Sequence, residues 1–131
     1  MRIIRFWLAA FLGVAALAGC SSQPVTAIKS IFQSKGEPQL QTGIRQYEDG
    51  KYAAATTSLQ DALSAGLSDA DQVTANKYLA FISCTQGRER QCRAYFRRAL
   101  ELNPAFELEP NEAGHPMWGP VFKNVKAGGR R

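Results

Sequence analysis

The sequence predicts an all-α protein, in which two similar helical hairpins lie between an N-terminal signal and tether and a C-terminal capping segment. Three observations predict this fold class. The sequence matches itself when it is shifted by 37 positions, each copy has a glycine near its middle, and apolar residues recur within each copy at helical spacing. The chain has 131 residues, of which 45% are hydrophobic, so it has room for one small domain.

Residues 1–19 have the order of a secretory signal peptide. Arg2 and Arg5 open the segment, an apolar run over residues 6–17 follows, and small residues close it. The apolar run is shorter than the roughly 20 residues that a membrane-spanning helix needs. We therefore expect an exported protein whose first segment directs export and is not part of the fold.

The end of this segment, Leu17-Ala18-Gly19-Cys20, resembles the bacterial lipobox. The resemblance implies that Cys20 is the site of lipid attachment and the first residue of the mature chain. Ser21, in place of aspartate, resembles the pattern that sorts lipoproteins of Gram-negative cells to the outer membrane, where they face the periplasm. A plain secreted protein and an uncleaved anchor are the alternatives.

Residues 20–36 are expected to form a tether. Val25, Ile28, Ile31 and Phe32 fall at helical spacing, so the tether can contain a short amphipathic helix. Such a helix could cap the domain or lie on the bilayer.

Residues 37–104 contain the internal repeat. The spacing predicts helices over residues 40–49, 52–65, 70–85 and 89–102. Gly50 and Gly87 suit the turn within each copy, because glycine adopts a positive φ at no steric cost. Pro104 disfavours helical geometry at Asn103 and therefore ends the last of the four helices.

Small and large apolar residues alternate along the second helix of each copy. The small positions allow two antiparallel helices to approach closely, and the large ones fill the space one turn away. The small residues are Ala55, Ala62, Cys92 and Ala99, and the large ones are Leu59 and Phe96. We interpret this pattern as helix packing and not as a binding site.

The repeat resembles the tetratricopeptide repeat family. The matching residues in the first copy are Gly43, Tyr47, Gly50, Tyr52, Ala55, Leu59 and Ala62, and in the second they are Leu79, Ala80, Gly87, Cys92, Phe96, Ala99 and Pro104. Gln39 and Asn76 replace the family's early tryptophan, and Leu67 replaces the terminal proline of the first copy. The resemblance implies a concave groove that binds peptides and partner helices, lined here by Leu40, Ile44, Tyr47, Lys77, Tyr78 and Phe81.

Cys84 and Cys92 lie on either side of the Gly87 turn. After export the chain meets an oxidising compartment, and a separation of eight residues across a helical hairpin can bring the two Cβ atoms within bridging distance. A disulfide is therefore expected, with two buried thiols as the alternative. We expect no metal site and no cofactor, because the single histidine, His115, has no partners at the spacing of a zinc site.

Residues 105–131 form a segment rich in proline and aromatic residues, followed by a basic tail. A final helix is expected over residues 118–126. The large apolar side chains are too many to leave in water, so we expect them to fold back over the second copy. Alternatively they form a docking motif for a partner, with Trp118 as its anchor.

Five arginines occupy residues 88–98, and three of them, Arg90, Arg93 and Arg97, share one helical face. The face is expected to be solvated, with Arg97 paired to Glu101, or else to contact acidic partner groups or lipid phosphates. Between residues 20 and 122 the chain has 10 basic and 11 acidic residues, so a broad face for nucleic acid is not expected.

The sequence contains no recognisable catalytic constellation, so we expect a non-enzymatic protein with protein partners and no small-molecule substrate. As a whole the chain looks like the small repeat lipoproteins associated with type VI secretion clusters. That resemblance implies an adaptor in an envelope-spanning machine, binding through Tyr47, Lys77, Tyr78, Phe81 and Trp118. Adaptors for pilus or outer-membrane protein assembly, and a cell-wall hydrolase or its regulator, are the alternatives.

Overall fold

The computed structural model describes residues 34–129, and this part of the chain is helical, with no strand. The predicted signal peptide, the predicted lipid-attachment residue Cys20 and all but the last three residues of the predicted tether lie outside the described residues. The helices are α2 (Glu37–Glu48), α3 (Tyr52–Ala65), α4 (Asp69–Thr85), α5 (Glu89–Leu102), α6 (Pro110–Ala113) and α7 (Gly119–Gly128). None of the helices of residues 34–129 has the length and apolarity needed to cross a membrane.

The all-α prediction is confirmed, and α2 to α5 begin and end within three residues of the predicted positions. Local signals account for these boundaries. The Ser68 side chain accepts a hydrogen bond from the backbone N–H of Asp71 at 3.2 Å and so caps α4, while α3 ends at Gly66, which has a φ of 104°. The predicted final helix is present as α7, whereas the single turn α6 was not predicted.

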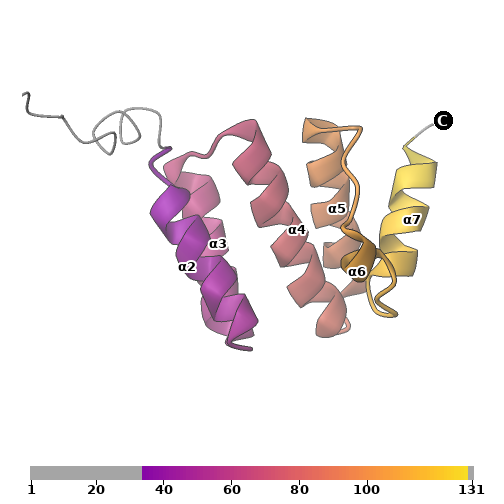
Figure 1. Cartoon of the computed structure of the whole chain (residues 1–131), viewed down its shortest axis with the longest axis horizontal. Coiled ribbons are helices and arrows are strands. Elements are labelled where there is room, and N and C mark those ends of the chain that lie inside the picture. The colour runs from indigo at the N-terminus through magenta and orange to yellow at the C-terminus, as the bar shows by residue number, and fades with distance from the viewer. Residues whose placement is uncertain (1–33, 130–131) are drawn as a thin grey trace, which may run out of the picture. The chain divides into compact units, whose positions relative to one another are not determined.

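Gly50 and Gly87 lie in the turns between the paired helices, as predicted. Their φ angles are 74° and 72°, a backbone conformation that other residues rarely adopt. Each turn reverses the chain within three residues, so that α3 runs back along α2 and α5 runs back along α4 (Figure 1).

The close approach of α2 and α3 depends on Gly43. A Cβ atom added at this glycine would lie 2.7 Å from Cγ of Leu59, well inside normal contact distance. The small residues expected at helix contacts, Ala55, Ala62, Cys92 and Ala99, are all fully buried. The predicted alternation of small and large apolar residues is therefore confirmed as helix packing.

The core has two adjoining regions. One joins α2, α3 and α4 around Leu40, Leu59 and Leu79. The other joins α4 and α5 to the C-terminal segment, which contributes Trp118 and Phe122. Helix α7 packs along α5 (Figure 1), with the ring of Phe122 5.2 Å from that of Phe96. The C-terminal segment thus covers the end of the second helix pair, as the capping interpretation expected.

Candidate partner-binding site

A row of aromatic side chains runs from α2 across α4, and we call it the aromatic row: Tyr47, Tyr78 and Phe81. The ring centroids of Tyr47 and Tyr78 lie 5.0 Å apart in an edge-to-face arrangement, and those of Tyr78 and Phe81 lie 6.0 Å apart in the same manner. Separations of this kind are the favoured ones for aromatic pairs. The structure therefore brings together three of the five residues that the sequence predicted to bind a partner.

The C-terminal segment adds the fourth aromatic residue to the row. Trp118 stacks on Phe81 with ring centroids 4.3 Å apart and an angle of 21° between the ring planes. Phe81 and Trp118 are only 2% and 8% exposed. Phe81, expected to line the groove, is therefore buried, because the chain's own C-terminal segment fills that part of the surface. Trp118, for the same reason, is a core residue here and not an exposed docking anchor.

Two polar interactions stabilise this segment, one within it and one that joins it to α4. The indole N–H of Trp118 donates to the backbone carbonyl of Glu112 at 2.9 Å. The carboxylate of Glu112 in turn accepts from the ammonium of Lys77 at 2.7 Å, and both side chains are largely buried, with 15% and 16% exposed. Lys77, predicted to line the groove, therefore forms an ion pair with the C-terminal segment.

Among the described residues, the part of the aromatic row on which Trp118 does not stack consists of Tyr47 and Tyr78, which are half-buried, and we call this pair the uncovered part of the row. Burial raises the pKa of Tyr47 to about 12, with smaller contributions from its neighbours. Burial also raises the pKa of Tyr78, mainly through loss of hydration. Both hydroxyls therefore stay neutral at physiological pH, and the pair offers ring surface with two uncharged hydrogen-bonding groups.

Met117 lies beside Trp118 in the chain and is 46% exposed, the highest value for a large apolar side chain among the described residues. Its backbone N–H donates to Nδ1 of His115 at 3.2 Å, and the imidazole of His115 stacks on the indole of Trp118. His115 thus helps to shape the C-terminal segment.

The sulfur atoms of Cys84 and Cys92 lie 2.03 Å apart, at disulfide bonding distance, and both residues are buried. The predicted pair is therefore in place. It joins the end of α4 to the first turn of α5, directly beside Gly87. Because Phe81 and Phe96 lie one turn from the two cysteines, the bridge fixes the helix pair on which Trp118 rests.

Residues 34–129 contain no group of three or more histidine, cysteine, aspartate or glutamate side chains placed to hold a metal ion. An open hollow of about 510 Å³ lies between α4 and the segment that follows α5, and it was not predicted. Four carboxylates and one ammonium group line it, namely Asp69, Glu107, Glu109, Glu112 and Lys77. The high proportion of glutamate in residues 107–112 was the one signal for it in the sequence, but only the fold brings these residues to Asp69.

Comparison of the chain with models of protein families, with curated proteins and with solved structures finds no match in any of the three.

Proposed function

We propose that the chain is a lipid-anchored, non-catalytic adaptor that binds other proteins through the uncovered part of the aromatic row. In this proposal Cys20 carries the lipid, and residues 37–104 form two repeats of the tetratricopeptide kind. The mature protein faces the periplasm from the outer membrane. It contacts components of an envelope-spanning assembly, of the kind associated with type VI secretion.

The repeat assignment is supported by equivalent features of the two helix pairs. Gly50 and Gly87, which are 37 positions apart, share a φ near 73°. Ala55 and Cys92, related by the same shift, are both fully buried. Repeats of this kind need caps at the ends of the array. The exposed side chains of α7, which include Lys123 and Asn124, give the array a polar end.

The observation that carries the binding proposal is the half-buried edge-to-face pair of Tyr47 and Tyr78. Tyrosine is enriched where proteins bind one another, because its ring is large and rigid and its hydroxyl tolerates water. The pair adjoins Phe81, on which Trp118 stacks, so a partner that contacts the tyrosines can also reach the C-terminal segment.

Recovery of the native lipidated protein from membranes, together with its bound proteins, tests this proposal. The double variant Tyr47→Ala, Tyr78→Ala should lose the partner that wild type retains. Tyr95→Ala is the matched control, since Tyr95 is also a half-buried tyrosine but lies on α5, where its hydroxyl is 3.4 Å from Nε2 of Gln60 in α3. Equal loss of the partner in both variants would contradict the proposal.

The anchor is tested separately by fractionation. Cys20→Ser should leave the protein unlipidated and in the soluble periplasmic fraction, whereas wild type should be recovered with the outer membrane. Membrane recovery of the variant equal to that of wild type would show that Cys20 is not the anchor.

A cell-wall hydrolase is the second candidate, and the acidic hollow is the observation that favours it. Glycoside hydrolysis uses two carboxylates flanking the substrate. However, Glu112 holds Lys77 with one oxygen and the backbone N–H of Glu109 with the other, so both oxygens already serve the fold. A hydrolase should lose activity toward cell wall when Asp69 or Glu107 becomes the amide, while an adaptor should retain its partner in those variants.

A further inference from the structure

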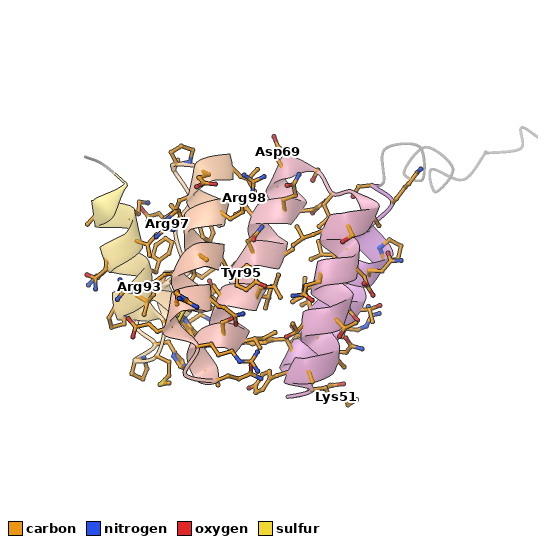
Figure 2. The ribbon with its side chains drawn as sticks, turned by 180° about the vertical axis from the view of Figure 1, so that it is seen from behind. Lys51, Asp69, Arg93, Tyr95, Arg97 and Arg98 are labelled. Carbon is orange, nitrogen blue, oxygen red and sulfur yellow. A yellow bond between two sulfur atoms is a disulfide. The ribbon has the colours of Figure 1, made fainter. Side chains whose placement is uncertain are left out.

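The outward face of α5 is strongly basic. Residues 88–102 contain five arginines and two glutamates, a net charge of +3, while residues 34–129 as a whole have 11 basic and 11 acidic side chains and are neutral. The charge is therefore concentrated on one element. Figure 2, which views the molecule from the side opposite to that of Figure 1, shows Arg93, Arg97 and Arg98 along α5. We call Arg90, Arg93, Arg97 and Arg98 the arginine face.

Only part of the arginine face is neutralised within residues 34–129. Arg93 pairs with Glu89, and Arg98 lies 3.4 Å from a carboxylate oxygen of Glu101. The expected pair of Arg97 with Glu101 is not formed. Arg90 and Arg97 are exposed and have no carboxylate within 4.0 Å in the described part of the chain. They lie two turns apart on the helix, about 10 Å along its axis, with the small exposed residue Ala94 between them.

We propose that the arginine face lies against the anionic headgroups of the membrane in which the chain is anchored. This inference rests on the lipid attachment in the proposed function. Thirteen residues separate Cys20 from Ser34, so Ser34, where the described residues begin, lies within at most roughly 50 Å of the anchor even if the segment is fully extended. A tether of this length allows the basic face to reach lipid phosphates, and each arginine near an anionic surface strengthens the attraction.

The arrangement has a consequence for the partner site. Arg90 and Arg97 project from α5, whereas the aromatic row belongs to α2 and α4. A domain that rests on α5 would therefore contact lipid through a helix that contributes no residue to the aromatic row, which leaves Tyr47 and Tyr78 for a periplasmic partner. The membrane contact would orient the adaptor as well as retain it.

Vesicle co-sedimentation of the Cys20→Ser chain, purified after export, tests the proposal without any contribution from the lipid anchor. The chain should bind vesicles of equal parts phosphatidylcholine and phosphatidylglycerol, bind poorly to phosphatidylcholine alone, and dissociate as salt is raised. Arg90→Gln, Arg97→Gln should lower the partition coefficient roughly thirtyfold, since each basic residue near the surface contributes about fivefold. Lys35→Gln, Arg45→Gln removes two exposed charges elsewhere and should change it little.

Three results would overturn the proposal. They are equal binding to both kinds of vesicle, equal loss of binding in the two double variants, and a self-associated form that Arg90→Gln, Arg97→Gln makes monomeric. The last result would mean that the arginine face binds a second copy of the chain and not a membrane. If Cys20 is not the anchor, the fractionation of the Cys20→Ser chain in cells would show it, and the vesicle result would be unchanged.

Discussion

The indole of Trp118 lies flat on the ring of Phe81, with centroids 4.3 Å apart. This contact joins the C-terminal segment to α4 across 37 residues of sequence, a separation equal to the period of the internal repeat. Trp118 therefore occupies a part of α4 that would otherwise expose a large aromatic ring, and it makes the C-terminal segment part of the domain's core.

Trp118→Ala should destabilise the fold substantially. Truncation of a buried tryptophan removes its apolar contacts and leaves a cavity, and it costs about 3–5 kcal/mol in well-packed cores. Urea unfolding should show the loss as a lower midpoint. Met117→Ala, a truncation at the exposed neighbouring position, should cost under about 1 kcal/mol. Similar costs for the two variants would mean that the segment does not rest on Phe81.

The Cys84–Cys92 bridge should be present in the exported protein and should stabilise it. The bridge closes a short loop, for which loop entropy predicts about 2–3 kcal/mol of stabilisation. Mass spectrometry without reductant should show the two cysteines linked, and reductant should lower the urea midpoint. The variant Cys84→Ala, Cys92→Ala should be insensitive to reductant. Two alkylatable thiols in the native protein would contradict the bridge.

Gly43→Ala should destabilise the first helix pair. The added Cβ would meet Cγ of Leu59 at 2.7 Å, and overpacking of this kind costs about 1–3 kcal/mol, which exceeds the gain in helix propensity. Gly128→Ala, at a helical glycine with open space around it, is the matched control and should be neutral or slightly stabilising. Thermal unfolding of the two variants compares these effects, and an unchanged melting temperature for Gly43→Ala would show that α2 and α3 are not in close contact there.

Tyr47 and Tyr78 should ionise at a higher pH than an unperturbed tyrosine. The folded pKa of Tyr47 is raised to about 12, and the pKa of Tyr78 is also raised, both mainly by burial. The neutral forms stabilise the fold fully below pH 10, and this contribution is lost as the pH rises toward 12, because the unfolded chain releases these protons first. Ultraviolet titration should show late ionisation that Tyr47→Phe removes in part. Loss of an ionisation step near pH 10, and not of a later one, in Tyr47→Phe would contradict the burial of the pair.

The helices of residues 37–102 were predictable because their signals are local. Gly50 and Gly87 mark the turns, and the buried positions Ala55, Leu59 and Ala62 recur 37 residues later at Cys92, Phe96 and Ala99. Each signal depends on neighbours within one or two helical turns, so a single sequence carries it.

The contact between Phe81 and Trp118 could not be predicted from such local signals. Residues 105–118 have no period, and their prolines permit several paths over the domain, so sequence spacing does not select which α4 residues they cover. The choice depends on a stacking contact with Trp118 and an ion pair between Lys77 and Glu112, each made across at least 35 residues. The acidic hollow beside α4 escaped prediction for the same reason.

Site-specific photo-cross-linking in cells tests the central claim most directly, namely that the surface of Tyr47 and Tyr78 binds a protein partner. A photo-reactive phenylalanine analogue in place of Tyr78 should form a cross-link to an envelope protein. The same analogue in place of Tyr95 should not form it. A cross-link of equal yield from both positions, or its absence from position 78 while position 95 reacts, would contradict the account.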